Sequence, residues 1–245
     1  MADGLLLVHA WPTDARIWGR QSRALDGRVP IVAPNLPGFG GSPTAGEVMT
    51  MGAAAERCLA ELDRAGVDRA VVCGISLGGY VTFELWRRAR ERVVGLVLAN
   101  TRAVADTEDA AEKRRVTAAR LTTEGTGFFL DPPPPLLSER APEDLRSWLY
   151  RLVAEQPAES IAAALLGMAE RPDSTSDLPG IDVPTLVVTS DLDALVPPEA
   201  SLAMAEAIPN ARTATLDGVG HLTNLEAADE FSTLLGEHLE ACGLG

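Results

Sequence analysis

A serine between two glycines is the residue whose type and spacing most directly suggest chemistry. Ser76 lies at the centre of Gly74-Ile75-Ser76-Leu77-Gly78, after the apolar residues 70–72 and before residues 80–88, where apolar side chains recur on one helical face. Where a strand turns sharply into a helix, the glycines let both elements approach closely, and the serine is left strained with its hydroxyl exposed. The first backbone N–H groups of the helix point at the same place, which favours a developing negative charge. The pattern predicts that Ser76 is a nucleophile. A base and an acid must also be found further along the chain, because the motif alone also arises by chance in glycine-rich loops.

The base can be chosen by elimination, because the sequence contains only three histidines. His238 lies beside Glu237 in the final amphipathic segment and is interpreted as a surface residue. His9 ends the first apolar strand, whereas His221 follows the last one, in a turn after Gly220. In the turn after Gly220 a mobile imidazole could reach over the carboxyl ends of the strands, where ligands of parallel sheets bind, so His221 is the predicted base. An ordinary polar loop residue is the alternative.

The acid must orient the imidazole of the base and stabilise its protonated form. Asp191 and Asp193 both follow the apolar residues 183–190, and Asp193 directly precedes the sequence Ala-Leu-Val-Pro-Pro. Asn100 and Thr101 follow an earlier strand and cannot carry the charge. The residues alone leave Asp193 and Asp191 as the two candidates.

These candidates need a scaffold of alternating strands and helices. Apolar segments predict strands, and segments with helical periodicity alternate with them. The predicted strands are residues 5–8, 29–34, 70–72, 93–99, 183–190 and 211–216, and the helices are residues 53–65, 80–88, 199–207 and 226–240. Such alternation predicts an α/β fold with a mostly parallel sheet of about six strands, covered by helices on both faces.

The alternation is interrupted between residues 101 and 182, where the sequence predicts no strand. Helical patterns occupy residues 107–123, 142–154 and 158–171, and a run of four prolines, residues 132–135, is interpreted as a rigid connector. We therefore expect a helical cap, residues 101–181, inserted into a core formed by residues 1–100 and 182–245.

Composition narrows the classes of function. A chain of 245 residues with 46% hydrophobic residues can bury the core of one domain with an insertion. The net charge of −14 argues against a nucleic-acid partner, and no segment has the pattern of a signal peptide or a membrane span. The three cysteines are scattered without the spacing of a metal site, which indicates reduced thiols. A cytoplasmic location without membrane contact is predicted.

Taken together, the motifs resemble the α/β-hydrolase fold superfamily over nearly the whole chain. The order Ser76, Asp193, His221, with residues 5–11, 37–42 and 220–226, is similar to bacterial carboxylesterases and 3-oxoadipate enol-lactonases. The resemblance favours Asp193 over Asp191 and implies an oxyanion hole formed by the backbone N–H groups of Leu77 and Trp11. It also implies a loop-positioning role for His9.

Three features depart from the family pattern. Ala10 stands where relatives have glycine, and Asn35 stands where they have aspartate, which leaves the hydrogen bonding of that loop open. The usual N-terminal hairpin is missing, so residues 29–34 are expected at an exposed edge of the sheet or paired with another subunit.

The resulting hypothesis is hydrolysis of a small carboxylic ester or lactone through an acyl-enzyme intermediate, without a metal or organic cofactor. Alternatives on the same triad are a thioesterase, a C–C bond hydrolase, a lyase, a cyclase or a perhydrolase, and a small-molecule-binding protein is a further alternative. Trp148, Phe128 and Leu222 are the candidate substrate-binding residues, and arginines 102, 114, 115 and 120 could meet an acidic substrate. The expected partner is the small-molecule substrate, with the protein a monomer or a homodimer.

Overall fold

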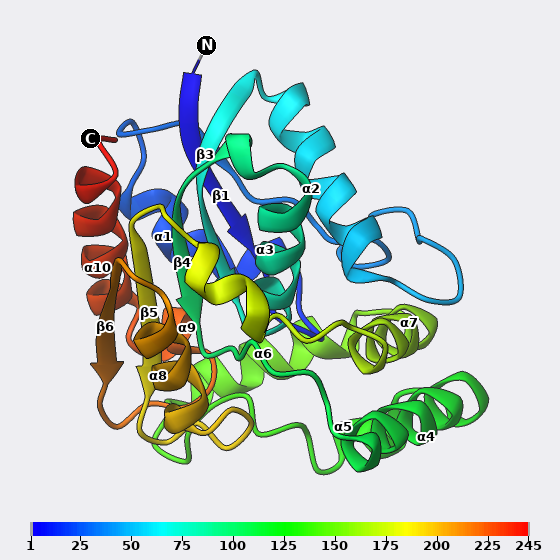
Figure 1. Cartoon of the computed structure of the whole chain (residues 1–245). Coiled ribbons are helices and arrows are strands. Elements are labelled where there is room, and N and C mark those ends of the chain that lie inside the picture. Colours follow the sequence, from blue (N-terminus) through cyan, green and yellow to red (C-terminus); the bar gives the residue numbers. More distant parts are fainter. Residues whose placement is uncertain (1, 245) are drawn as a thin grey trace.

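The core of the protein is a single parallel sheet, seen in the computed structural model, which describes residues 2–244. Its strands are β1 (Ala2–Val8), β2 (Ile31–Val32), β3 (Val67–Ile75), β4 (Val93–Ala99), β5 (Thr185–Ser190) and β6 (Ala211–Leu216). They lie in the order β2-β1-β3-β4-β5-β6, and every neighbouring pair is parallel (Figure 1). The predicted fold class and strand number are confirmed.

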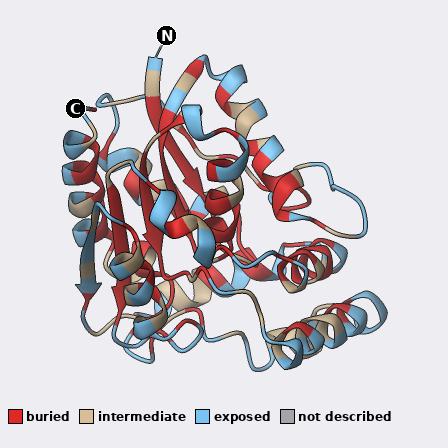
Figure 2. Ribbon diagram, viewed as in Figure 1, coloured by how far each residue is buried: buried red, intermediate tan, exposed pale blue. Residues whose placement is uncertain are grey.

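Both faces of the central strands β1, β3, β4 and β5 are buried because alternate residues of these strands meet different helices, whereas the edge strand β6 is largely exposed. In β1, Leu6 and Val8 belong to one apolar cluster, whereas Leu5 and Leu7 belong to the other. The first cluster includes residues of α2 (Met51–Arg64), α3 (Leu77–Arg88) and α8 (Pro198–Ala207). The second includes residues of α10 (Ala228–Ala241) and the two residues that flank α1 (Gly19–Ala24), Trp18 and Leu25. Figure 2 shows the resulting buried strands between helices whose outer faces are exposed. The continuous apolar strand sequences follow from this two-sided burial.

One edge of the sheet is formed by β2, which pairs only with β1 and is two residues long. The prediction that residues 29–34 lie at an edge is confirmed. A short edge strand offers little unpaired backbone to another chain.

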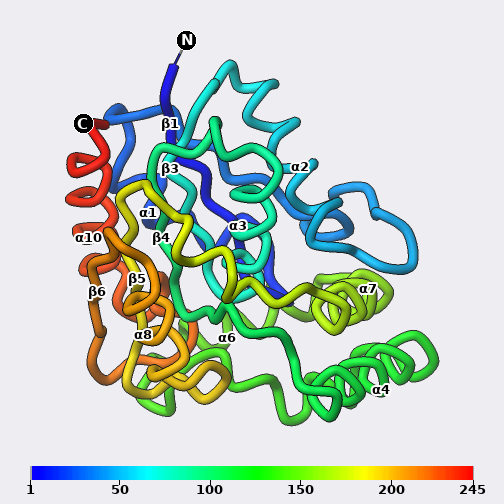
Figure 3. The backbone as a smooth tube through the Cα atoms, viewed as in Figure 1, coloured from blue at the N-terminus to red at the C-terminus, as the bar shows by residue number. Residues whose placement is uncertain are grey.

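Four helices and a 3₁₀ helix separate β4 from β5, and this segment, residues 100–184, is called the helical insertion. It contains α4 (Glu108–Glu124), α5 (Gly127–Leu130), α6 (Glu143–Ala154), α7 (Ala158–Ala169) and η3 (Thr175–Gly180). Thr107 begins α4 by accepting a hydrogen bond from the backbone N–H of Ala110. Figure 3 shows the chain passing from the carboxyl end of β4 into these helices and returning to β5. The three helices predicted in this interval correspond to α4, α6 and α7.

Three short elements complete the chain: η1 (Ala15–Trp18), η2 (Arg90–Arg92) and α9 (Thr223–Glu226). Within residues 2–244, the structure contains no helix whose length and apolar content would let it cross a bilayer.

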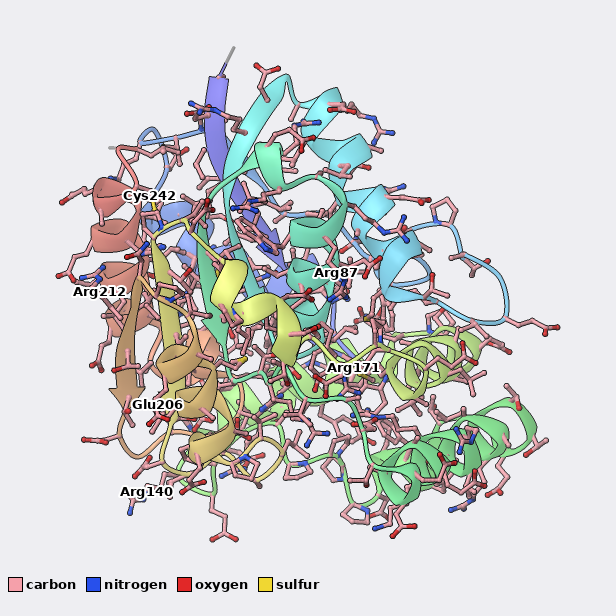
Figure 4. The ribbon with its side chains drawn as sticks, viewed as in Figure 1. Arg87, Arg140, Arg171, Glu206, Arg212 and Cys242 are labelled. Carbon is pink, nitrogen blue, oxygen red and sulfur yellow. The ribbon has the colours of Figure 1, made fainter. Side chains whose placement is uncertain are left out.

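The interpretation of His238 as a surface residue is wrong, because only 1% of its surface is exposed. His238 follows Phe231 and Leu235 on the inward face of α10, and its Nε2 lies 3.6 Å from the sulfur of Cys242. The helical spacing of these residues, rather than the neighbouring Glu237, determines its burial. Figure 4 shows Cys242 at the end of the molecule opposite the helical insertion.

Candidate active site

Ser76 occupies the turn between β3 and α3 in a conformation that few residues adopt. Its φ of 55° is positive, and Asn100 is the other non-glycine residue with positive φ in the described chain. The backbone N–H of Ser76 donates to the Ala99 carbonyl at 2.9 Å, and the Thr101 hydroxyl donates to the Ser76 carbonyl at 2.8 Å. These bonds hold the strained turn against the end of β4.

The glycines on either side of Ser76 are required by contact between backbones. A Cβ on Gly74 would collide with the carbonyl of Gly78, and a Cβ on Gly78 would collide with the carbonyl of Val8. The first turn of α3 therefore packs directly on β1 and β3, which is the reason expected from the sequence for the small residues at these positions.

Asp193 follows β5 and His221 follows β6, so both lie at the carboxyl ends of the strands, as Ser76 does after β3. The His221 Nδ1 lies 2.9 Å and 2.8 Å from the two carboxylate oxygens of Asp193, and both side chains are buried. Because Nδ1 faces a carboxylate, it carries the proton, and Nε2 keeps its lone pair. An imidazole fixed in this way can accept a proton at Nε2.

The Asp193 carboxylate accepts three hydrogen bonds in addition to its contact with His221. The backbone N–H groups of Leu195 and Val196 donate to Oδ1, and the Asn100 amide donates to Oδ2 at 3.0 Å. Burial by itself would raise the pKa of Asp193, but the hydrogen bond and charge of His221, with these donors, outweigh it and lower the pKa. Asp193 therefore stays ionised behind the imidazole.

Asp191, the alternative acid, does not face His221. It is exposed, and its Oδ1 accepts the backbone N–H of Gly218 at 2.6 Å. Of the two candidate carboxylates, the structure brings only Asp193 to the imidazole.

Residues 100 and 101 connect the Ser76 turn to the Asp193–His221 pair. Asn100 donates to Asp193 while its neighbour Thr101 donates to the carbonyl of Ser76. Within residues 2–244 the Ser76 hydroxyl itself forms no hydrogen bond with His221 or any other group, so it is available to an incoming carbonyl. Nucleophile–base hydrogen bonds are often long without substrate and tighten when it binds.

The backbone N–H groups of Trp11 and Leu77, the two donors that the resemblance implies, have no acceptor among the described residues. Leu77 opens α3, where the helix leaves its first N–H groups unsatisfied. Trp11 follows β1, and its indole N–H donates to the Ile161 carbonyl of α7 at 3.1 Å. Unpaired donors of this kind can stabilise negative charge on an oxygen placed between them.

The loop that carries Trp11 is held by His9 and Asn35. His9 Nε2 accepts the backbone N–H of Leu36 at 3.0 Å, and burial lowers the pKa of His9 to about 4, so it stays neutral. The amide of Asn35 accepts from the Ala15 N–H and donates to the Gly40 carbonyl, both at 2.9 Å. An aspartate could not make the second bond, so the departure at residue 35 has a structural role.

The three candidate substrate-binding residues lie in different places. Phe128 and Trp11 line a hollow of about 460 Å³, together with residues 132–135 and Lys113. Trp148 lines a separate hollow of about 550 Å³ beside Arg20 and Leu225. Leu222 is fully buried, and its N–H donates to the Leu136 carbonyl.

The arginines considered for an acidic substrate are all engaged in ion pairs. Arg120 pairs with Glu124, and Arg115 pairs with Glu108 and Glu112. Arg102 and Arg114 pair with Asp106.

Asp106 is the centre of a second buried ionic cluster that sequence analysis missed. Its side chain is fully buried and contacts Arg102 at 2.6 Å, Arg114 at 2.5 Å and Arg171 at 2.9 Å. The Arg171 guanidinium also lies 4.1 Å from the centre of the Tyr80 ring on α3. Figure 4 shows Arg171 at the junction between α7 and the core. Arg102 and Asp106 are only four residues apart, but Arg171 lies 65 positions further along the chain, and no local pattern indicates that it joins them.

Among the described residues, no group of three or more histidine, cysteine or carboxylate side chains could hold a metal ion.

The chain is similar in sequence and in structure to known hydrolases. A family model described as the alpha/beta hydrolase family matches residues 5–234. The pimeloyl-[acyl-carrier protein] methyl ester esterase of Aromatoleum aromaticum is 31% identical over 245 residues, covering 94% of this chain and 96% of the relative. The 3-oxoadipate enol-lactonase 1 of Acinetobacter baylyi is 25% identical over 236 residues, covering 94% of this chain and 86% of the relative. A solved thermophilic esterase from Thermogutta terrifontis, with malate bound, matches with a TM-score of 0.93 and 38% identity, covering 99% of this chain and 92% of that structure.

Proposed function

The chain belongs to the alpha/beta hydrolase family, and from this premise we propose that it is a serine hydrolase. Ser76 is the nucleophile, His221 the general base and Asp193 the acid that orients the base. The observation that supports this assignment is the buried hydrogen bond of 2.8 Å from His221 Nδ1 to Asp193, at the sheet edge where Ser76 occupies a strained turn.

The proposed reaction is acyl transfer to water. As the Ser76 oxygen attacks the carbonyl carbon, His221 Nε2 takes the hydroxyl proton, and the N–H groups of Trp11 and Leu77 hold the oxyanion. The tetrahedral intermediate collapses, and the leaving alcohol takes the proton from His221. Water then attacks the acyl-enzyme with His221 as base, which releases the acid and restores the Ser76 hydroxyl. Each step needs only protons that the residues already exchange, so no metal or organic cofactor takes part.

The proposed substrate is a small carboxylic ester or lactone. Two similar proteins are named as a methyl ester esterase and an enol-lactonase, and a similar solved structure is described as an esterase. The helical insertion lies at the carboxyl ends of the strands, where Ser76 lies (Figure 1). We propose that residues 101–181 of it form a cap that bounds the acyl or alcohol group.

The test is turnover of p-nitrophenyl butyrate, and of a panel of esters, lactones and thioesters, by Ser76→Ala beside the wild type. Loss of the nucleophile is expected to lower kcat on the order of 10⁶-fold. Thermal unfolding is expected to stay unchanged, because the hydroxyl of Ser76 makes no hydrogen bond in the described chain. Ser22→Ala on α1 is the matched control and should keep wild-type turnover.

A fluorophosphonate probe separates the remaining functions. Covalent labelling that disappears in Ser76→Ala, together with ester or lactone turnover, is the expected result. Labelling without turnover of any panel member would replace the hydrolase with a non-hydrolytic enzyme on the same nucleophile. Undiminished turnover in Ser76→Ala would disprove the assignment.

A further inference from the structure

We infer that Asn100 is a positioning residue for the acid–base pair: its amide holds the Asp193 carboxylate and joins it to the loop that carries His221. The inference rests on the proposed function, because it assigns a role relative to Asp193 and His221.

The contacts of Asn100 use the whole amide. Its Nδ2 donates to Asp193 Oδ2 at 3.0 Å and to the Ser190 hydroxyl at 2.9 Å, and its Oδ1 accepts from the Thr223 hydroxyl at 2.8 Å. The Ser190 hydroxyl in turn donates to the Gly220 carbonyl at 2.7 Å, directly before His221. Asn100, Ser190 and Thr223 are fully buried. One side chain therefore connects the ends of β4 and β5 to both sides of the histidine.

The network fixes the orientation of the amide. A carboxylate can only accept hydrogen bonds, so the group facing Asp193 must be Nδ2. The Thr223 hydroxyl then finds Oδ1 as its acceptor. Every polar atom of the Asn100 side chain has a partner, which is what a rigid buried network requires.

The backbone of residue 100 places the amide in this position. Its φ is 44°, in the left-handed region, and its N–H donates to the Val188 carbonyl at 2.9 Å, continuing the pairing of β4 with β5. Asparagine and aspartate tolerate this conformation better than other residues with a Cβ. Aspartate is thus matched to Asn100 in both shape and backbone preference.

The charge of the side chain is what distinguishes the two residues here. An asparagine supplies a neutral donor to the single negative charge behind His221. A carboxylate in its place would put a second negative charge about 3 Å from Asp193, and two such groups share one proton until the pH is high enough to remove it. The choice of amide at residue 100 follows from the use of Asp193 as the acid.

The experiment is the pH dependence of kcat and kcat/KM for Asn100→Asp with p-nitrophenyl butyrate. At low pH the shared proton lets the new carboxyl donate to Asp193 as the amide did, so the acidic side of the profile should stay close to wild type. At high pH both carboxyls ionise and repel, and kcat is expected to fall about tenfold or more below wild type, with KM changed less. A residue that only supported the fold would lower activity equally at all pH values.

The matched control is Thr189→Val. Thr189 is fully buried beside Ser190, but its hydroxyl has no hydrogen-bond partner, and valine has the same shape. This variant should keep the wild-type profile.

A second variant decides the matter if Asn100→Asp does not fold. Thr223→Val removes only the donor to Asn100 Oδ1 and is expected to lower kcat about two- to tenfold at unchanged KM. Wild-type kcat in Thr223→Val, or a wild-type pH profile in Asn100→Asp, would overturn the inference. If turnover still depends on Ser76 in that case, the proposed function stands, whereas turnover without Ser76 would remove both.

Discussion

Two buried aspartates, Asp193 and Asp106, lie on either side of the boundary between the core and the helical insertion. Both side chains are fully buried, and burial alone would raise the pKa of each, yet partners lower both values. The partners differ in kind. Asp193 is held by an imidazole, an amide and two backbone N–H groups, whereas Asp106 is held by three guanidinium groups.

The kind of partner distinguishes a carboxylate suited to catalysis from one that stabilises the fold. Guanidinium groups stay protonated at all relevant pH values, so the charges around Asp106 cannot change during a reaction. An imidazole can take up and release a proton during a reaction, and the Asp193 carboxylate would stabilise its charged form. A lowered pKa alone therefore does not identify a catalytic group, and the nature of the partner does.

The position of the Asp106 cluster agrees with an architectural role. Arg102 and Asp106 lie where the chain leaves β4, and Arg171 follows α7, where the chain returns toward β5. Arg171 also donates to the Val104 carbonyl at 3.0 Å. The cluster therefore joins the segment that enters the helical insertion to the segment that leaves it.

The largest expected difference between the two aspartates is in turnover. Asp193→Asn removes the charge that orients and stabilises the imidazole, and kcat should fall about 10⁴-fold. Asp106→Asn should leave kcat within about threefold, because its effect on the reacting groups is indirect. Steady-state kinetics of both variants with p-nitrophenyl butyrate measure the contrast. Equal losses in the two variants would contradict the distinction drawn here.

The second expected difference is in stability, with the opposite ranking. Asp106→Asn leaves three arginines without their common counter-charge, and we expect a loss of about 3 kcal/mol in the free energy of unfolding. For a chain of this size the melting temperature should fall about 6–12 °C. Asp109→Asn, an exposed aspartate in the first turn of α4, is the control and should cost no more than about 1 kcal/mol. A smaller loss in Asp106→Asn than in Asp109→Asn would remove the architectural role.

Lowering the pH extends the comparison to His9 and His238, the two buried histidines that do not contact Asp193. Burial lowers the pKa of His9 to about 4, and burial with the charge of Arg212 lowers that of His238 to about 4. The unfolded chain binds these protons near pH 6.5, so the histidine contribution is complete above about pH 6.5 and is lost as the pH falls toward 4. Each histidine accounts for a loss on the order of 3 kcal/mol. The two aspartates, with lowered pKa values, lose their contributions only below about pH 4.

His238→Leu checks this order of events, because leucine keeps an apolar group on the inward face of α10 and cannot titrate. Urea unfolding at several pH values between 6.5 and 4 is expected to show a decline in unfolding free energy smaller by up to about 3 kcal/mol than in the wild type. Turnover at pH 7.5 should be unchanged, since His238 lies on α10 away from the carboxyl edge of the sheet. An unaltered pH dependence of stability would show that His238 is not one of the titrating groups.

Much of the fold was predictable because strands and helices depend on patterns of neighbouring residues in the sequence. Apolar runs alternating with helical periodicity indicate a parallel sheet covered by helices, and the six predicted strands correspond to β1–β6. The Ser76 turn was predictable for the same reason: glycines at 74 and 78 permit a contact between backbones that no other residue allows. Phase along a helix is also local, so the burial of His238 could have been predicted from its spacing to Phe231 and Leu235.

Tertiary structure alone decided which side chains meet. The sequence by itself left Asp191 and Asp193 as alternatives, and the fold turned one toward Gly218 and the other toward His221. The contact between Asn100 and Asp193 joins residues 93 positions apart. Periodicity determines which face of an element is buried, but contacts between distant loops depend on how strands are ordered and how each loop leaves its strand.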